Sequence, residues 1–292
     1  MAALDEICAL AEPHAGAVQQ GISRFQVFSQ SHTTQLMPLV YDPVISLVLQ
    51  GKKRTLIGNT SLEYGPGQYI IVAAEVTAFG QVYEASENVP FVAVYLSIDS
   101  SVISALLTDM AEMKLSPHLT SGFGAGTATE LELDCWKRMV DLLNRPEEVP
   151  ILHSQLEREL LFRLLMGSQG HVLRGMRAGD SAVAPIRKVM SWIRESYTSS
   201  LNIDVMADMA GMSLSVFYRR FKAVTGITPL QYQKNIRLHE ARRRMLSEGQ
   251  TAAAAGFSVG YESAPQFSRE YKRLFGYPPG QDTDLLKQYL EK

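Results

Sequence analysis

The sequence predicts an α+β protein. It places an antiparallel barrel or sandwich with appended helices before an all-α domain, in which a linker helix joins two helix-turn-helix motifs. Three observations support this prediction. Short β-rich runs fill the first hundred residues, and apolar residues at helical spacing follow them. A basic segment near the C-terminus then recurs at a constant offset of 50 residues, which indicates two copies of one supersecondary unit.

Composition favours two domains with an uneven charge distribution. The chain has 292 residues and is 46% hydrophobic, enough to bury a substantial core. Residues 184–292 contain 16 Lys and Arg against 10 Asp and Glu, a net charge of +6, whereas the remainder carries −8. We therefore expect a polyanionic partner for the C-terminal part alone.

Signals for export and membrane insertion are absent from the sequence. No run of about 18 apolar residues occurs, and the N-terminus is acidic where a secretory signal would be basic. The two cysteines, Cys8 and Cys135, form neither a disulfide framework nor a CxxC metal spacing. These features predict a cytoplasmic protein with reduced thiols and no membrane association. Cys8, near the N-terminus, is the better candidate for a redox switch.

Five β-rich runs precede residue 100. They are ISRFQVF (22–28), VISLVLQ (44–50), RTLIG (54–58), QYIIVAA (68–74) and FVAVYLS (91–97). Glycine-containing turn signals at residues 58–59 and 65–67 separate some of these runs, as expected for antiparallel strands. A barrel of such strands can hold a small ligand.

Helical spacing predicts three helices after Asp99. Ser100 or Ser101 is expected to cap the first, residues 144–146 end the second, and the third runs from Pro150 to Gly167. These helices either form a dimer face or simply cover the barrel. Residues 167–184 contain four glycines and no sustained periodicity, which predicts a linker between domains 1–166 and 185–292.

The first helix-turn-helix motif is predicted at residues 203–225. A positioning helix (203–210) leads through Gly211 and Met212 to a recognition helix capped by Ser213. Phe217, Phe221 and Val224 lie at i, i+4 and i+7 of that helix and are expected to face inward. Among the outward residues, Ser215, Tyr218 and Arg219 are predicted to contact base edges. Arg220 and Lys222 are predicted to contact phosphates.

The second motif repeats this pattern with a different outer face. Ser263 is its predicted cap, and Phe267, Tyr271 and Leu274 form the inward side. Its predicted base contacts are Ala264, Pro265, Ser268 and Arg269, and its predicted backbone contacts are Lys272 and Arg273. Two of these base-contact positions have no side-chain donor, and Gly256 costs the preceding helix about 1 kcal/mol relative to alanine. We expect this motif to be less sequence-specific than the first.

A linker helix is predicted from Pro229 to Leu246, capped by Thr228. Its 18 residues span about 27 Å, which separates the motifs by nearly one duplex turn once the offset of each motif is added. Arg242, Arg243 and Arg244 are either contacts to the DNA backbone or solvated surface residues.

The C-terminal segment 184–280 resembles the DNA-binding domain of AraC/XylS-type transcription regulators. The resemblance is carried by FYRRFKAVTGITPLQY (217–232), by the glycine-containing lead-in to Ser263 (256–263) and by SREYKRLFGYPP (268–279). It assigns base reading to the seven outward positions named above. The chain departs from the family pattern at Ala255 and Gly256, and in the Ala264–Pro265 pair, which bears on the affinity of the second motif. YDPVISLVLQGKKRTLIG (41–58) and YGPGQYIIV (64–72) resemble the cupin-like regulatory domain of one subgroup.

The resemblance implies a sequence-specific transcription regulator whose cupin-like barrel senses a small-molecule effector. The expected partners are double-stranded promoter DNA, that effector, a second copy of the chain, and RNA polymerase if the protein is an activator. One alternative is a constitutive DNA-binding regulator whose barrel serves only dimerisation. The other is a cupin enzyme, but the chain has no HxH, P-loop, GxSxG or HExxH motif, so we expect no enzyme activity, no metal and no cofactor.

Overall fold

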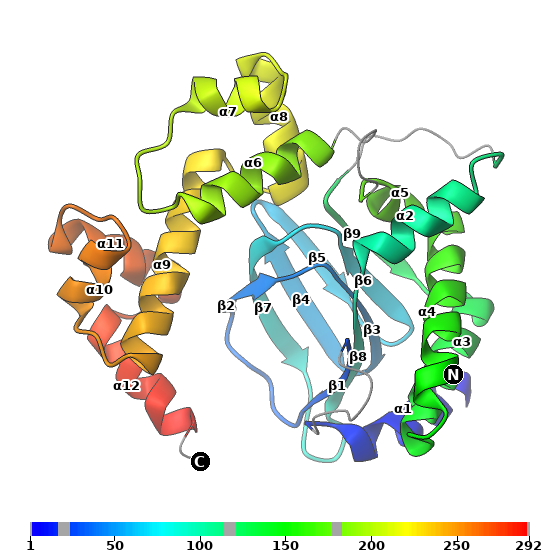
Figure 1. Cartoon of the computed structure of the whole chain (residues 1–292). Helices are drawn as coiled ribbons and strands as arrows, with labels where there is room; N and C mark the ends of the chain where they lie inside the picture. The colour runs from blue at the N-terminus through cyan, green and yellow to red at the C-terminus, as the bar shows by residue number, and fades with distance from the viewer. Residues whose placement is uncertain (1, 17–23, 114–120, 177–182, 291–292) are drawn as a thin grey trace. The chain divides into compact units, whose positions relative to one another are not determined.

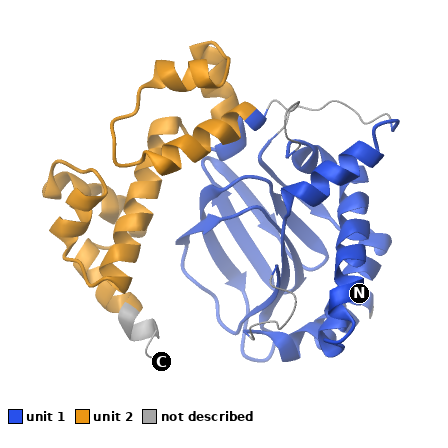
Figure 2. Cartoon of the chain, in the orientation of Figure 1, with its two compact units in different colours: residues 1–184, 223–226 blue, residues 185–222, 227–292 orange. Residues whose placement is uncertain are grey.

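The computed structural model describes residues 2–16, 24–113, 121–176 and 183–290. The chain divides into two compact units (Figure 2). The first contains residues 1–184 with 223–226, and the second contains residues 185–222 with 227–292.

The first unit contains two antiparallel sheets. The larger sheet has the strand order β1 (Phe25–Gln30), β8 (Phe91–Ser97), β3 (Val44–Gln50), β6 (Gln68–Val72) and β9 (Phe123–Thr127). The smaller sheet has the order β2 (Met37–Tyr41), β7 (Val76–Glu84), β4 (Lys52–Ile57) and β5 (Thr60–Tyr64). The inner faces of both sheets share one apolar cluster, which includes Val48 and Val72 from the larger sheet and Ile57 from the smaller. The predicted barrel or sandwich is therefore confirmed.

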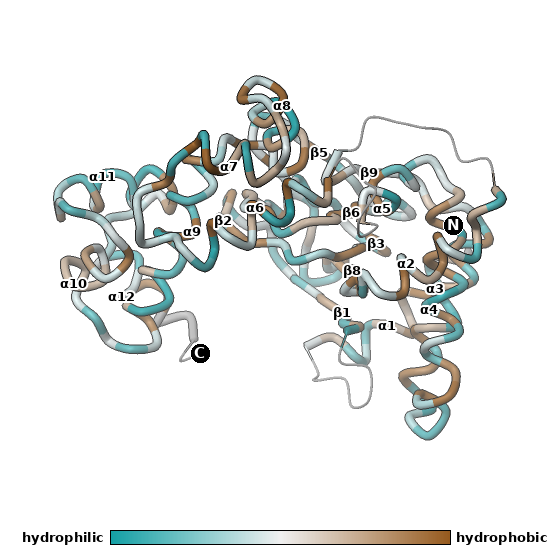
Figure 3. The backbone as a smooth tube through the Cα atoms, turned by 45° about the horizontal axis from the view of Figure 1, so that its top comes forward, coloured by the Kyte–Doolittle hydropathy of each residue, from teal (hydrophilic) through white to brown (hydrophobic). Residues whose placement is uncertain are grey.

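The central strands of the larger sheet are buried on both faces. One face of β3 meets the smaller sheet, and the other contributes Ile45 and Leu47 to a second apolar cluster formed with the helices. A strand covered on both sides is expected to be apolar along its whole length. Figure 3 shows β3 mostly in hydrophobic colours, in contrast to helix α11 (Ala264–Phe275), which is mostly in hydrophilic colours.

Four strands were not predicted from the sequence. They are β2, β5, β7 and β9. Pro38 interrupts β2, and Gly124 and Gly126 interrupt β9, so neither reads as a run of β-forming residues. In β7, Gly80 has the same effect. Neighbouring strands supply the hydrogen bonds that local propensity does not predict.

Helices cover the outer face of the larger sheet (Figure 1). They are α1 (Ala2–Ala11), α2 (Ser100–Asp109), α3 (Glu130–Asp141), α4 (Val149–Met166) and α5 (Gly170–Arg174), with the short 3₁₀ segments η1 (Glu12–His14) and η2 (Leu142–Asn144). Fully buried Trp136 of α3 packs with Phe25 of β1, their ring centroids 6.1 Å apart. The cap of α2 was predicted wrongly, because Asp99, and neither of the serines, accepts the hydrogen bond from the Ser101 backbone N–H.

The expected linker 167–184 is partly folded. Its residues 170–174 form α5, and Val172, Leu173 and Met176 are buried in the core of the first unit. An isolated turn of helix is too short to show periodicity, so the glycines dominated the prediction. Residues 177–182 lie outside the described part of the chain.

The second unit is entirely helical in its described residues. Its helices are α6 (Ala184–Glu195), α7 (Ile203–Met209), α8 (Leu214–Thr225), α9 (Pro229–Ser247), α10 (Ala252–Ser258), α11 and α12 (Pro279–Leu290). Helix α9 runs from the α7–α8 pair to the α10–α11 pair (Figure 1). The predicted cap of α9 is confirmed, since Thr228 and Gln231 form a reciprocal capping box before Pro229. Its 19 residues span about 28 Å.

Candidate DNA-binding surface

The first helix-turn-helix motif consists of α7 and α8. Asn202 caps α7 by accepting hydrogen bonds from the backbone N–H groups of Asp204 and Val205. The turn begins at Gly211, whose φ of 63° is a conformation that favours glycine. The Met212 N–H then donates to the Ala207 carbonyl at 3.0 Å, which closes the turn between the two helices.

Helix α8 separates an apolar from a basic side. Phe217 and Phe221 are fully buried, with ring centroids 5.7 Å apart, as the spacing predicted. The predicted contact residues lie elsewhere on the helix: Ser215, Tyr218, Arg219 and Lys222 are exposed, and Arg220 is half-buried. Within the described residues, the three basic side chains of α8 form no hydrogen bond or ion pair. They remain available to an anionic partner.

The second motif, α10 and α11, presents a similar surface. Ser263 accepts a hydrogen bond from the Gln266 N–H as the predicted cap, and Gly276 ends α11 with a φ of 85°. Phe267 and Tyr271 are fully buried. On the other sides, Pro265, Arg269, Lys272 and Arg273 are exposed, whereas Ala264 and Ser268 are half-buried.

The three basic side chains of α11 are unpaired in the described structure, whereas its acidic side chain is paired. Arg269, Lys272 and Arg273 have no side-chain hydrogen bond or ion pair in the described structure. The acidic residue of the helix, Glu270, is held by Lys234 of α9 at 2.8 Å and by the Tyr261 hydroxyl at 2.9 Å. Its negative charge is thereby offset within the protein, and the net charge offered by α11 is positive.

The arginines of the linker helix are engaged inside the second unit. Arg242 forms two hydrogen bonds to Asp282 of α12, at 2.8 and 2.9 Å. Arg243 and Arg244 both pair with Glu240 at 2.8 Å. The surrounding carboxylates therefore compete with DNA phosphates for these guanidinium groups, so the expectation of backbone contacts receives no support.

Two residues of α9 that the sequence did not single out hold neighbouring segments to this helix, and one of them, Arg237, connects the two motifs. Arg237 donates to the carbonyls of Tyr197 at 2.5 Å, Ser199 at 3.0 Å and Gly260 at 2.9 Å. Gln233 donates to the first two of these carbonyls, at 2.9 and 2.6 Å. The loop before α7 and the turn of the second motif are thus fixed to one helix. An arginine among many on a basic helix gives no sequence signal for this role.

Both cysteines are free thiols, as the sequence predicted, and both are buried. Burial, together with the nearby carboxylates of Glu12 and Asp5, raises the pKa of Cys8 to about 11. Because the thiolate is the reactive form, Cys8 is a poor candidate for a redox switch.

The described residues meet the requirements of neither a metal site nor a membrane-spanning helix. No group of three or more His, Cys, Asp or Glu side chains in the described ranges is arranged to hold a metal ion. None of the described helices is both long and apolar enough to cross a membrane.

Comparison with known families covers both units. The family described as "AraC-type transcriptional regulator N-terminus" matches residues 21–172. A second family, described as "Helix-turn-helix domain", matches residues 206–283. The two matches together include both sheets and both recognition helices.

Individual proteins resemble the chain over most of its length. The HTH-type transcriptional activator RhaS of Enterobacter sp. (strain 638) is 22% identical over 243 residues, which cover 77% of this chain and 85% of that protein. Vibrio cholerae O395 ToxT, bound to (E)-4-(8-methylnaphthalen-1-yl)but-3-enoic acid, shares the fold with a TM-score of 0.58 at 12% identity, covering 90% of this chain and 99% of ToxT. Unsaturated fatty acid-bound ToxT of strain SCE256 gives 0.52 at 12% identity, with 88% and 94% covered.

Proposed function

Because the chain belongs to the AraC-type transcriptional regulators, we propose that its two motifs bind adjacent half-sites of promoter DNA under the control of its barrel. The chain is a DNA-binding transcription regulator with an N-terminal regulatory domain. The observation that carries the proposal is the pair of recognition helices with unpaired basic side chains. Members of this family are regulators, so the role requires no catalytic residue.

The division between base and phosphate contacts follows from side-chain chemistry. On α8, we assign Ser215, Tyr218 and Arg219 to base edges, and Arg220 and Lys222 to phosphates. On α11, the base contacts are assigned to Ala264, Pro265, Ser268 and Arg269, and the phosphate contacts to Lys272 and Arg273. All the charged members except half-buried Arg220 are exposed, and none of them has a side-chain partner in the described structure, which supports this assignment.

The barrel is proposed to sense a small-molecule effector. Its two sheets enclose an inner face to which polar as well as apolar side chains contribute. Two structures of ToxT, which has the same fold, contain a bound carboxylic acid. Effector binding would change how the two motifs engage a promoter, by a difference in effector affinity between the DNA-bound and free states.

The remaining partners follow from this role. We propose that the protein acts as a homodimer in the cytoplasm, where promoter DNA is located. If it is an activator, as the related RhaS is named, RNA polymerase is a further partner.

The DNA assignment is tested by comparing Arg219→Ala with Lys222→Ala. Loss of a base-contacting arginine costs about 1–3 kcal/mol of binding free energy and relaxes sequence preference at its position. Loss of a phosphate contact weakens binding to all sequences alike and lowers the salt-dependence slope by about one unit. Mobility-shift titrations on the native promoter and on scrambled DNA measure both effects. Equal losses on every sequence for both variants would contradict the assignment.

A further inference from the structure

Strand β4 carries three consecutive cations, and one of them has no carboxylate partner. Lys52 pairs with Glu84 at 2.7 Å and Arg54 pairs with Glu63 at 2.8 Å. Lys53, between them, points to the opposite face of the strand, which is the interior between the two sheets. Across the ranges that the structure describes, no Asp or Glu side chain lies within ion-pair distance of Lys53.

Phenol groups take the place of a counter-ion. The Lys53 Nζ lies 3.4 Å from the Tyr95 hydroxyl, and 5.6 and 5.7 Å from the ring centroids of Tyr41 and Tyr95. Burial opposes the charge, but Tyr95 and Tyr41 raise the pKa of Lys53 above its usual value, so the amine is charged at neutral pH. A phenol hydroxyl and two aromatic rings offset less of that charge than a carboxylate would.

A second polar group on the same face has no partner. Ser46 of β3 lies directly opposite Tyr95 in the β3–β8 register, so their side chains share the interior face. Ser46 is 1% exposed, and its hydroxyl has no hydrogen-bond partner in the described structure. A buried hydroxyl without a partner is destabilising unless a bound molecule satisfies it.

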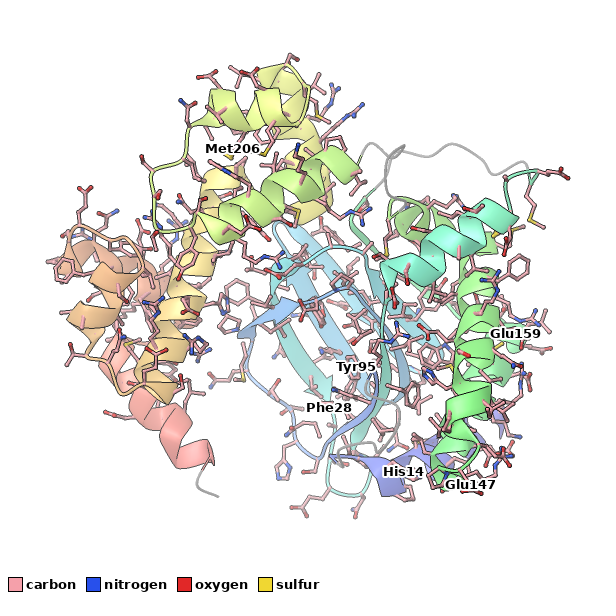
Figure 4. The ribbon with its side chains drawn as sticks, viewed as in Figure 1. His14, Phe28, Tyr95, Glu147, Glu159 and Met206 are labelled. Carbon is pink, nitrogen blue, oxygen red and sulfur yellow. The ribbon has the colours of Figure 1, made fainter. Side chains whose placement is uncertain are left out.

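The surroundings of Lys53 are close-packed on one side and open to solvent on another. The absence of a side chain at Gly80 of β7 lets Leu39 pack close to Lys53, since a Cβ there would lie 2.5 Å from Leu39 Cδ2 and 3.5 Å from Lys53 Cε. Lys53, Tyr95 and Leu39 are half-buried, so solvent reaches this part of the interior. The Phe28 ring packs edge-on against Tyr95 at 6.2 Å (Figure 4), and more apolar side chains, including Val48 and Phe91, extend along the same face.

We propose that this interior face binds a small organic carboxylate. Its anionic group pairs with Lys53 Nζ and accepts hydrogen bonds from the Tyr95 and Ser46 hydroxyls, while its carbon body packs against the apolar side chains. One cation matches one carboxylate charge, whereas a phosphate ester carries nearly two charges at neutral pH and would be only half offset. The inference rests on the proposed effector-sensing role and names the chemical class of the effector.

The test compares Lys53→Met with Lys52→Met in the full-length chain. The probes are hexanoate and phenylacetate, each paired with its uncharged amide, and binding is measured by calorimetry and thermal melting. We expect at least one carboxylate to raise the melting temperature of the wild type and to bind about tenfold or more tightly than its amide. Lys53→Met should lose that difference, and Lys52→Met should keep it because its charge lies on the outer face.

Stability without ligand separates a binding role from a structural one. Lys53→Met should melt at a higher temperature than the wild type, because it removes a cation without a carboxylate partner from the interior. Ser46→Ala provides an independent variant, with unimpaired melting and a smaller loss of carboxylate affinity.

Three outcomes would overturn the proposal: no binding of either carboxylate, equal binding of the amides, or unchanged carboxylate binding by Lys53→Met. A failure of the proposed regulatory function would give results different from these three outcomes. A neutral molecule that alters promoter binding would refute the carboxylate while preserving effector sensing. Loss of promoter binding itself would refute the function.

Discussion

The two helix-turn-helix motifs have recognition helices of equal length that are supported by different interactions. Helices α8 and α11 each contain 12 residues at a constant offset of 50. Behind α8, the Phe221 ring packs against Tyr232 at 5.7 Å. Behind α11, the position equivalent to Tyr232 is Asp282, which accepts hydrogen bonds from Tyr271 at 2.7 Å and from Arg242. A repeated backbone can therefore be kept while an apolar support is replaced by a buried polar one.

The turns differ as well. In the first motif the Met212 N–H donates to the Ala207 carbonyl, and in the second the Tyr261 N–H donates to the Gly256 carbonyl, 49 residues later. Because the recognition helices are 50 residues apart, the second turn has one residue more than the first. In the second motif the Tyr261 ring, which lies in this longer turn, packs against the Phe267 ring, with the ring centroids 5.3 Å apart. Gly256, which stands where the first motif has Ala207, lies against Phe267 too.

The largest expected effect comes from removing Asp282. Asp282→Ala should destabilise the second motif by about 3–5 kcal/mol, because it leaves the largely buried Arg242 and the Tyr271 hydroxyl without their partner. Hydrogen exchange of the full-length chain measures this change, with faster exchange expected in α11 and α12 than in α8. Exposed Asp284→Ala is the matched control, with an expected change within about 0.5 kcal/mol. Equal acceleration in both motifs would show that they share one support.

A pH effect is expected next, and it also belongs to the second motif. The His239 ring packs against Phe275 at 5.2 Å, and burial, assisted by Arg242, lowers the pKa of His239 to about 4. Between pH 6.5 and 4 the unfolded chain binds a proton that the folded chain does not, so stability is lost as pH falls through this window. The total loss is about 3 kcal/mol.

Urea unfolding at pH 7 and pH 5 measures the His239 contribution. About 2 kcal/mol of the difference between these conditions should disappear in His239→Gln, which does not titrate. An identical pH dependence in the variant and the wild type would assign the effect to other groups.

DNA binding provides the third comparison. Arg269→Ala should cost less binding free energy than Arg219→Ala, at the lower end of about 1–3 kcal/mol, because Ala264 and Pro265 beside it offer no side-chain donors to base edges. Selection of bound sequences from a random pool measures the preference of each half-site. A stronger preference in the half-site read by Arg269 would reverse the proposed ranking of the motifs.

The smallest effect is expected at Gly256. Alanine would gain about 1 kcal/mol of helix propensity, but its Cβ would lie 2.9 Å from Phe267 Cγ, and such overpacking typically costs about 1–3 kcal/mol. We expect Gly256→Ala to destabilise the second motif by about 1 kcal/mol in thermal or chemical unfolding. Ala207→Gly, the reciprocal change in the first motif, should also destabilise by about 1 kcal/mol. A stabilised Gly256→Ala variant would show that the Phe267 ring has room to move.

The helices and the central strands could be predicted because their signals are local. Periodicity located the inward side of α8, and Thr228 followed by Pro229 located the start of α9. Strands β2 and β9 could not be predicted, since their pairing with β7 and β6 overrides the proline and glycines they contain. The α+β architecture was nevertheless predicted correctly, because it depends on the strong elements.

Contacts between side chains that are distant in the sequence were harder to predict. The sequence shows three adjacent arginines on α9 but not the distant Asp282 that binds Arg242. It likewise shows cations on β4 without indicating that Lys53 alone faces the interior, because that depends on strand register. The outer side of α8 was accessible, since exposure within one amphipathic helix follows from its own spacing.

The contacts of Arg237 have a consequence for promoter architecture. By binding the carbonyls of Tyr197, Ser199 and Gly260, this guanidinium restricts both the separation and the rotation of the motifs about α9. Each base pair inserted between two half-sites turns one of them by about 35° around the duplex axis. If the two motifs bind adjacent half-sites as proposed, this restriction makes binding depend on the number of base pairs between the half-sites as well as on their bases.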